Sequence, residues 1–516
     1  MMKRFTLCLL TLALAVTAVQ ARRIVIKVYG EDEKTPHQKI TGFGAADCDG
    51  AMKPYGSDIK PVQLLYGKTS KVGLNIMRME ISPSFNGDDG VSWGSTYNWY
   101  GSVPCAREAK RRGAIVFGTP WSPPGAYKTN GTAQGGNSDD QGNQRGELRE
   151  DCYEKFFPWL NSYLAYMKSK GIAVDAVSVQ NEPDWWVSYS GCLYTPAQQV
   201  TLVKNYAHML DRETYNGVKL ISAEPLGFTQ NYSDALMNDP VAREQIDIVA
   251  GHIYGHAPLD NGNMKDAAVL ALKYGKEIWM TEHSVSDYLE DRLPNWDEQI
   301  DFAQEINECM EAGCSGYIYW YMRAHWAFVG TGETDKYGSE NKKNVLLPRA
   351  YIYSHFAKHL AGSTRLQTRT SPADVFSGTN SNFEYNAFVN GDSLIMIAIN
   401  AIETPNTLVF RFPKEVKVGK QIISTGNDKT ERCIETDIEL EEPTKDVTVD
   451  QPGKSICTFI FKVYHEEDAI SNIDAEKALL ANDRFSDGIY DFSGRRLSVK
   501  PIKGLYIQNG KKMMLK

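Results

Sequence analysis

The chain has 516 residues, of which 42% are hydrophobic and 23% are charged, a composition typical of a soluble globular protein with more than one domain. Its formal net charge of −8 and its pI near 5.7 argue against nucleic acid as a partner, because such a partner favours a basic surface. Neutral polymers and small molecules remain possible ligands.

The first twenty-one residues predict a secretory signal peptide. Lys3 and Arg4 form a basic start, an apolar run extends from Phe5 to Val19, and Ala21 offers a small residue for cleavage. The run is too short to span a membrane comfortably, and no transmembrane segment is expected later in the chain. Residues 1–21 are therefore expected to be removed during export, which would leave a secreted, cell-surface or periplasmic protein.

An alternation of strand-like and helix-like stretches begins near residue 40. Residues 22–39 come first and contain an alternating strand. Eight strand-like runs follow, at residues 40–46, 75–80, 114–120, 174–182, 220–225, 246–254, 277–282 and 316–322. With amphipathic helices between them, they predict an α/β fold, a (β/α)8 TIM barrel over residues 40–362. A doubly wound sheet is disfavoured, because Gly42-Phe43-Gly44-Ala45 lacks the third glycine of a phosphate-binding turn.

From about Phe383 the helices give way to short alternating runs, and Asn390-Gly391-Asp392 is a hairpin signal. Residues 363–466 are expected to form an antiparallel β-sandwich side domain attached to the barrel, joined by the strand in residues 22–39. Residues 467–516 resemble the C-terminal sorting tails of bacteria that export proteins across the outer membrane. The alternative for this segment is a short β appendage without an address.

Polar and aromatic residues cluster at the carboxyl ends of the predicted barrel strands, the face where barrel active sites lie. They are Arg78, Glu80, Trp121, Asn181, Glu182, Glu224, His252, Tyr254, Glu282, Trp320 and Arg323. Two of the strands end in a similar way, one in Asn181-Glu182-Pro183 and the other in Thr281-Glu282-His283. This pair of glutamates is the strongest candidate for chemistry.

Two carboxylates at a barrel mouth suggest hydrolysis of glycosides, in which one group is protonated and the other ionised. Glu182 follows an amide and precedes aromatic residues, whereas Glu282 has candidate hydrogen-bond donors in Arg78 and Tyr254. A separation of about 5–5.5 Å would make Glu282 a nucleophile and retain the anomeric configuration.

Each of these residues also has a structural interpretation. One buried strand-end glutamate is more often a salt-bridge partner, but two of them favour catalysis. An ion pair for Arg78 and core packing for Tyr254 stay open, and Glu80 and Glu224 are expected to be structural. The sequence has no His-Glu-x-x-His and no paired Cys-x-x-Cys, so neither a metal nor a cofactor is expected.

These motifs resemble glycoside hydrolase family 30, within the clan of retaining (β/α)8 glycosidases. The matched stretches include Gly42-Phe43-Gly44, Asn75-Ile76-Met77-Arg78, Thr119-Pro120-Trp121-Ser122-Pro123-Pro124, Val179-Gln180-Asn181-Glu182-Pro183-Asp184, Trp279-Met280-Thr281-Glu282 and Tyr319-Trp320-Tyr321-Met322-Arg323. They run in the family's order over residues 40 to about 360.

The resemblance implies roles for individual residues. Glu182 corresponds to the acid/base and Glu282 to the nucleophile. The residues that position them are Arg78, Asn181 and Tyr254. Trp121 and Trp320 correspond to the subsite that holds the cleaved sugar, and Trp186 and His252 are further expected substrate-binding residues.

Within the family the chain is most similar to bacterial xylanases that recognise glucuronic acid branches on xylan. Those enzymes carry two adjacent arginines after the eighth strand, and the second grips the glucuronate. Here Arg323 is followed by Ala324. A carboxylate is best held by a fixed arginine, so Arg323 and Arg349 are the candidates to substitute, and whether a glucuronate branch is required stays open.

The expected function is that of a secreted retaining endo-β-1,4-xylanase of the glucuronoxylan type, a monomer whose partner is a polysaccharide. One alternative keeps the mechanism and changes the substrate to β-1,6-glucan or another branched β-glycan. The other alternative, from a different class, is a glycan-binding barrel without catalysis, which binding without turnover would indicate.

Overall fold

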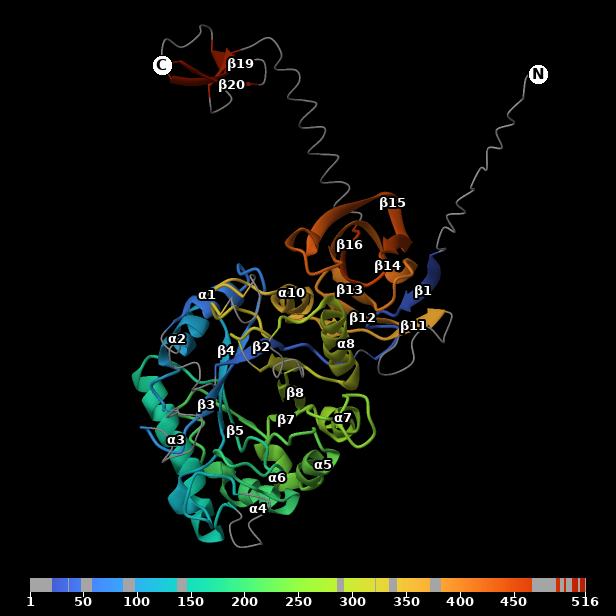
Figure 1. Cartoon of the computed structure of the whole chain (residues 1–516). Helices are drawn as coiled ribbons and strands as arrows, with labels where there is room; N and C mark the ends of the chain where they lie inside the picture. The colour runs from blue at the N-terminus through green and yellow to red at the C-terminus, as the bar shows by residue number, and fades with distance from the viewer. Residues whose placement is uncertain are drawn as a thin grey trace, which may run out of the picture.

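The computed structural model describes residues 21–35, 37–47, 58–86, 98–136, 146–284, 292–320, 322–333, 341–371, 382–465, 489–491, 496–497, 504–508 and 511–515. These residues build a closed parallel barrel ringed by helices, a mostly antiparallel sheet beside it and a small sheet near the C-terminus (Figure 1). The predicted (β/α)8 barrel with a β side domain is confirmed.

The barrel closes through eight strands in chain order. They are β2 (Gly42–Asp47), β3 (Ile76–Ile81), β4 (Ile115–Pro120), β5 (Ala176–Ser178), β6 (Lys219–Ile221), β7 (Ile248–His252), β8 (Glu277–Glu282) and β9 (Gly316–Tyr319). Parallel pairing of β2 with β9, from Gly42 opposite Gly316 to Ala45 opposite Tyr319, completes the ring. All strand carboxyl ends therefore meet at one mouth.

Helices cover the outside of the barrel. They are α1 (Lys60–Leu65), α2 (Val103–Arg111), α3 (Tyr153–Ser169), α4 (Pro196–Tyr206), α5 (Gln230–Asn238), α6 (Pro240–Gln245), α7 (Met264–Lys273), α8 (Trp296–Ala312) and α10 (Pro348–Leu360). Local sequence sets the ends of α8. Asn295 and Glu298 form a reciprocal capping box at its start, and Gly313 ends it with a φ of +107°, which glycine adopts without strain.

The side domain is one curled sheet. Its strand order is β10-β12-β13-β16-β14-β1-β11, with β15 also paired to β14. The strands are β1 (Arg22–Val28), β10 (Thr364–Arg365), β11 (Thr368–Ser371), β12 (Phe383–Asn390), β13 (Ser393–Asn400), β14 (Asn406–Ser424), β15 (Ile434–Gln451) and β16 (Ser455–Val463). The strand from the front of the chain, β1, runs parallel to β14 and antiparallel to β11.

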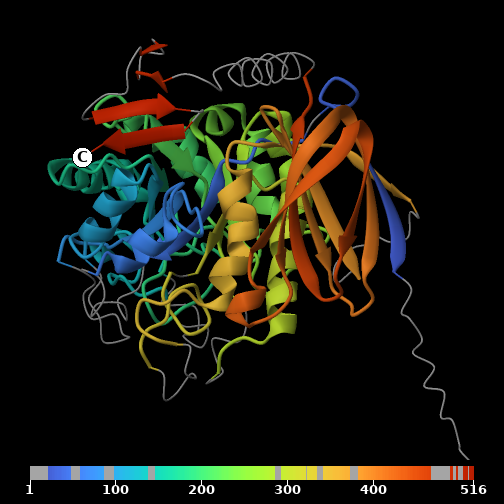
Figure 2. The same cartoon turned by 90° about the horizontal axis from the view of Figure 1, so that it is seen from above.

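Alternate residues of β13 join the side sheet to the barrel. Ile395, Ile397 and Ile399 belong to the barrel's core cluster, whereas Leu394 and Met396 belong to the core inside the sheet domain. This is the two-residue period of a strand buried on both faces. Figure 2 shows the sheet lying against α8 and α10, and both helices contact β13.

The C-terminal segment contains a small sheet of β17 (Ile489–Tyr490), β18 (Arg496–Leu497), β19 (Gly504–Gln508) and β20 (Lys511–Leu515). The signal-peptide prediction falls on residues 1–20, which lie outside the described residues, and on Ala21. Across the helices that the structure describes, no helix combines the length and apolarity needed to cross a membrane.

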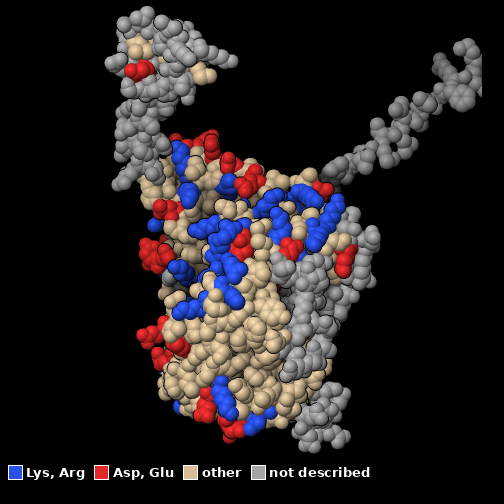
Figure 3. All heavy atoms as spheres, turned by 90° about the vertical axis from the view of Figure 1, so that its left-hand side faces the viewer, with Lys and Arg blue, Asp and Glu red and all other residues tan. Residues whose placement is uncertain are grey.

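Charge is unevenly spread on the face that carries α1, α2 and α3. Lys and Arg side chains gather in the upper part of this face (Figure 3). On α2, Glu108 accepts hydrogen bonds of 2.7 Å from both Arg111 and Arg112. Ion pairs with solvent-exposed members contribute only about 0–1 kcal/mol, so the fold depends on its core rather than on this surface.

Candidate active site

The inside of the barrel changes from apolar to charged towards its mouth. Ile76, Phe117, Ile248 and Trp279 belong to one buried cluster contributed by different strands. Because strand side chains alternate, the residue two positions after Ile76 points to the same side, and that residue is Arg78. The alternation of side chains along the strand therefore places polar groups inside the barrel, at the point where the apolar core ends.

An irregularity in β8 aims Glu282. Gly251 of β7 pairs with Met280, but the next residue, His252, pairs with Glu282, so Thr281 is one extra residue on β8. Bulges of this kind redirect side chains and are frequent beside active sites. This bulge brings Glu282 opposite His252.

Glu182 lies in a turn after β5, where the backbone is hydrogen-bonded to the chain segments on both sides. The amide of Asn181 donates to the carbonyl of Pro120 at 2.9 Å, and the amide of Glu182 donates to the carbonyl of Glu224 at 2.8 Å. Glu182 has a φ of +44°, a conformation uncommon for a residue with a side chain. Such backbone persists where the surroundings over-determine it, as they do here.

Two donors hold the Glu282 carboxylate. The Arg78 Nη1 group donates to Glu282 Oε2 at 2.5 Å, and the Tyr254 hydroxyl donates to Oε1 at 3.1 Å. The other guanidinium nitrogen, Arg78 Nη2, donates to the Asn181 side-chain oxygen at 2.7 Å. The residues expected to position the glutamates therefore lie together around them.

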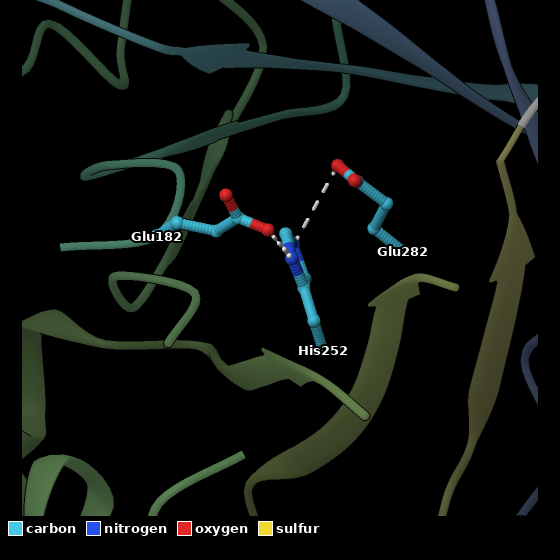
Figure 4. Close-up of side chains that lie close together, drawn as sticks. All are labelled: Glu182, His252 and Glu282. Carbon is cyan, nitrogen blue, oxygen red and sulfur yellow. Dashed lines mark hydrogen bonds and ion pairs between the residues drawn. The ribbon is translucent and has the colours of Figure 1, made fainter. Parts of the chain in front are cut away.

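His252 lies between the two glutamates (Figure 4). Its Nδ1 is 3.1 Å from Glu182 Oε1, and its Nε2 is 3.9 Å from Glu282 Oε2. An oxygen of Glu182 and an oxygen of Glu282 lie within 4.8 Å of one another. Both carboxylates keep slight exposure, 7% for Glu182 and 6% for Glu282, so they can be reached from the mouth.

A third carboxylate, Glu224, completes the network. It is fully buried and accepts hydrogen bonds from Arg78 Nη2 at 3.1 Å and Thr119 Oγ1 at 2.8 Å, while His252 Nε2 lies 3.3 Å from it. The sequence placed Glu224 at the mouth but gave no sign of these partners, which come from three other strands.

The network shifts the pKa values of Glu182, Glu224 and His252 in different directions. Burial raises the pKa of Glu182, an effect that the His252 contact only partly offsets. Burial acts on Glu224 as well, but the charges of Arg78 and His252 outweigh it and lower the pKa of Glu224 to about 2. Burial would lower the pKa of His252, yet the surrounding glutamates raise it to about 9, so the ring is an imidazolium at neutral pH.

Aromatic side chains line the mouth beside this network. Trp121 and Trp320 pack with ring centroids 5.9 Å apart, and the Arg78 guanidinium lies 4.5 Å from the Trp121 ring. Tyr189, from the loop after β5, packs on the same cluster and was not singled out from the sequence. Aromatic rings beside carboxylates suit the binding of sugar rings.

Two expected substrate-binding residues, Trp186 and His252, lie away from this aromatic cluster. Trp186 lines a separate cavity of about 350 Å³ with Asp184 and Tyr232. The His252 ring is fully buried behind the glutamates. It faces their carboxylates rather than the open mouth, so the structure favours a role through Glu182 over direct sugar contact.

Arg323, which was expected to bind substrate, is held by protein groups. Its side chain is buried and donates to Asp58 Oδ2 at 3.0 Å and to the Asn344 side chain. The other candidate, Arg349, is buried and donates to the Tyr319 hydroxyl at 2.9 Å. Protein acceptors therefore meet both guanidiniums, and a contact of either with a branch carboxylate stays a prediction.

Glu182, His252 and Glu282 are close enough to be considered as ligands for a metal ion. Two features make the group a poor donor set. Both ring nitrogens of His252 already face carboxylates, and the Arg78 cation lies 2.5 Å from Glu282. A divalent cation there would be repelled by this guanidinium and by the imidazolium.

Comparisons with known proteins agree with this geometry. A family model described as "Glycosyl hydrolase catalytic core" matches residues 153–341, which include both glutamates. Glucuronoxylanase XynC of Bacillus subtilis (strain 168) is 25% identical over 413 residues, 77% of this chain and 85% of that protein.

One solved structure and one further relative extend the comparison. A glycoside hydrolase family 30 subfamily 8 xylanase, Xyn30A, from Clostridium acetobutylicum matches with a TM-score of 0.67 and 27% identity, covering 86% of this chain and 100% of that one. An endo-1,6-beta-D-glucanase of Neurospora crassa is 26% identical over 167 residues, 28% of this chain and 34% of that protein. With the motifs, the barrel and these likenesses in agreement, the chain is a glycoside hydrolase that is similar in sequence and fold to family 30 and resembles the glucuronoxylanases.

Proposed function

We propose that the protein is a secreted retaining endo-β-1,4-xylanase in which Glu182 and Glu282 carry out a double displacement. The observation that carries this proposal is the separation of the two carboxylates, whose nearest oxygens lie within 4.8 Å. Retaining glycosidases hold their carboxyl groups about 5–5.5 Å apart, whereas inverting enzymes need about 6.5–9.5 Å to admit a water molecule.

In the first step, a Glu282 oxygen attacks the anomeric carbon while the bond to the leaving sugar breaks. Glu182 gives its proton to the departing oxygen, so the chain is cut and a glycosyl ester forms on Glu282. The raised pKa of Glu182 supports this role, because the acid must carry a proton near neutral pH.

In the second step, ionised Glu182 takes a proton from water, and the water oxygen attacks the anomeric carbon. The bond to Glu282 breaks, which frees its carboxylate and restores the proton on Glu182. Two inversions leave the configuration retained. Arg78 and Tyr254 keep Glu282 aimed, because both donate hydrogen bonds to its oxygens.

Two observations support xylan as the substrate: the similarity of the chain to xylanases, and the aromatic pair Trp121 and Trp320. The glucuronoxylanase and the family 30 xylanase cover most of this chain. Trp121 and Trp320 are suited to hold the cleaved sugar beside Arg78. Since Asp58 and Asn344 occupy the guanidinium of Arg323, we expect cleavage that does not depend on a glucuronate branch.

Digestion of two xylans tests the substrate proposal. One xylan carries glucuronate branches, the other carries only arabinose, and the products are sized. We expect both to be cut at similar rates. Cleavage of the glucuronate-branched polymer alone would show that another residue reads the carboxylate, and cleavage of neither would overturn the xylan assignment. Glu282→Gln is the control that the activity belongs to this barrel.

A β-1,6-glucan is the second candidate substrate, because an endo-1,6-beta-D-glucanase is among the relatives. That likeness covers 28% of this chain, against 77% for the glucuronoxylanase. Hydrolysis of a β-1,6-glucan with xylan left intact would favour this candidate. Binding of either glycan with no products from either would favour a non-catalytic barrel.

Export and domain organisation are part of the proposal. The basic and apolar start of the chain supports cleavage near Ala21, and residues 467–516 would serve as a sorting tail behind a barrel of residues 40–362 and a sheet domain of residues 363–466. N-terminal sequencing of the mature protein tests the cleavage site. Deletion of residues 467–516 should leave xylan hydrolysis unchanged and alter where the protein accumulates.

A further inference from the structure

The mouth contains a carboxylate that the proposed mechanism does not use. Glu224 is fully buried, so no substrate atom reaches it. Its two oxygens face Arg78 from β3, Thr119 from β4 and His252 from β7, at 3.1, 2.8 and 3.3 Å. A purely packing role would not require a charged group to meet three polar partners at once.

Two of these partners also hold the catalytic pair. Arg78 contacts Glu224 through Nη2 and Glu282 through Nη1. His252 faces Glu224 through Nε2 and Glu182 through Nδ1. We propose that Glu224 is a positioning residue of the hydrolysis reaction, which anchors Arg78 and His252 from behind so that they hold Glu282 and Glu182 apart and aimed. This inference rests on the proposed roles of Glu182 and Glu282.

The geometry shows what Glu224 prevents. His252 Nε2 is 3.3 Å from Glu224 but only 3.9 Å from Glu282 Oε2. Without the Glu224 charge, this N–H group would turn to Glu282 and bridge the two catalytic carboxylates. This further hydrogen bond would pull the Glu282 carboxylate away from the position that Arg78 and Tyr254 set, so the rate would fall although both glutamates remain present.

Glu224 also sets the charge of the cluster. The charged and titratable groups that surround it are Arg78 from β3, His252 from β7, Glu182 after β5 and Glu282 from β8, with Tyr254 beyond Glu282. Removing one negative charge from this group favours loss of the protons that Glu182 and His252 carry. The alkaline limb of the activity profile should therefore move to lower pH.

Glu224→Gln in the full-length protein tests the inference, with kcat and KM measured across pH on a β-glycan that the wild type hydrolyses. We expect kcat to fall about 10- to 100-fold with KM near the wild-type value, and the alkaline limb to shift downwards. Glu224→Asp keeps the charge, so its alkaline limb should stay at the wild-type pH even where kcat falls.

Glu277→Gln is the matched control. Glu277 begins β8 at the opposite end of the same strand as Glu282, where it pairs with Lys219 at 2.7 Å. Its replacement also removes a carboxylate from the barrel but should leave the pH profile in place. An unchanged kcat and pH profile in Glu224→Gln, or a change in KM alone, would overturn the positioning role.

Thr119→Val decides the question if Glu224→Gln does not fold. It removes one hydrogen bond to Glu224 and keeps the charge, so kcat should fall several-fold with the pH limbs unmoved. Wild-type kcat in this variant would overturn the proposal. Failure of the xylan assignment would appear separately as absence of xylan cleavage by the wild type, and failure of the mechanism as activity retained in Glu282→Gln.

Discussion

Two fully buried glutamates in this protein have opposite surroundings. Glu224 at the barrel mouth faces the cations Arg78 and His252, and its pKa falls to about 2 although burial acts against this. Glu384 of β12 accepts from the amides of Gln304 at 2.7 Å and Asn307 at 3.1 Å on α8. Burial, with Glu308 nearby, raises the pKa of Glu384 to about 8.

The difference shows that burial alone does not decide the charge of an interior carboxyl group. Amide donors satisfy hydrogen bonds but supply no positive charge, so Glu384 at the interface between sheet and barrel holds its proton at neutral pH. Cations at the mouth keep Glu224 ionised. Catalysis needs fixed charges, whereas an interface needs only satisfied polar groups, and one residue type serves both.

The largest contrast should lie in the rate of hydrolysis. Glu182→Gln removes the proposed general acid and should lower kcat on xylan about 10²- to 10⁴-fold. Glu384→Gln should leave kcat unchanged. An aryl glycoside with a good leaving group needs no protonation of the departing oxygen. On that substrate the rate of the first step should therefore fall much less in Glu182→Gln. A measured burst of aryl alcohol would show this.

Glu224→Gln should lower the free energy of unfolding of the protein. The folded pKa of about 2 lies below the ordinary value of 4.5, so this stabilisation is present above pH 4.5 and is lost as the pH falls through 2. Breaking a buried pair costs about 3–5 kcal/mol. Urea unfolding at neutral pH should show this loss, and the gap to the wild type should narrow in acid. An equal gap at both pH values would contradict the ionised state of Glu224.

The opposite sign is expected at Glu384. Its folded pKa of about 8 lies above 4.5, so wild-type stability falls as the pH rises from 4.5 to 8, at roughly 1.4 kcal/mol per pH unit at most. Glu384→Gln cannot ionise and should be more stable than the wild type by about 4 kcal/mol at pH 8. Thermal melting at pH 8 and pH 4 checks this, and a variant less stable than the wild type at pH 8 would remove the contrast.

The smallest effect should follow Tyr254→Phe. This change removes one hydrogen bond of 3.1 Å to Glu282 while Arg78 still holds the carboxylate. One hydrogen bond to a charged group contributes about 1.5–3 kcal/mol, so the lower end, about a tenfold loss of kcat, is expected with the second donor intact. Wild-type kcat would show that Arg78 alone keeps Glu282 aimed.

Strand positions in the barrel could be predicted because apolar runs end in polar residues at a fixed place. Residues 277–282 were expected as a strand and form β8. Residues 174–182 were expected as one strand, but β5 spans only Ala176–Ser178 because the chain turns at Glu182. Positive φ at a glutamate has no sequence signature.

The sheet domain was predicted less completely. Two short runs, residues 408–412 and 421–424, belong to the single long strand β14. Its partner β15 was not expected, because most of its side chains are exposed and seven of its 18 residues are acidic, and pairing through the backbone leaves little hydrophobic pattern. The parallel pairing of β1 with β14 could not be predicted, because all the barrel strands come between these two strands in the sequence.

Partners far apart in the chain explain the remaining differences at the site. Glu182, Glu282 and their neighbours could be found because their motifs are local. Arg323 was expected to bind substrate, but it pairs with Asp58, 265 residues away. Glu224 meets Arg78 across 146 residues. Such contacts appear only when the ring of strands closes.

The place of β1 in the side sheet has a consequence for how the protein is made. Val28 ends β1, and its parallel partner begins at Asn406, nearly four fifths of the way along the chain. At a synthesis rate of about 5–20 residues per second, β1 waits roughly 20 to 80 seconds for β14. Until then β1 lacks the strand that pairs with it in parallel, and the core around Ile24 and Ile26 lacks the side chains of β14. The first strand to be translated is therefore among the last to be placed, and the sheet is completed only when nearly all of the chain exists.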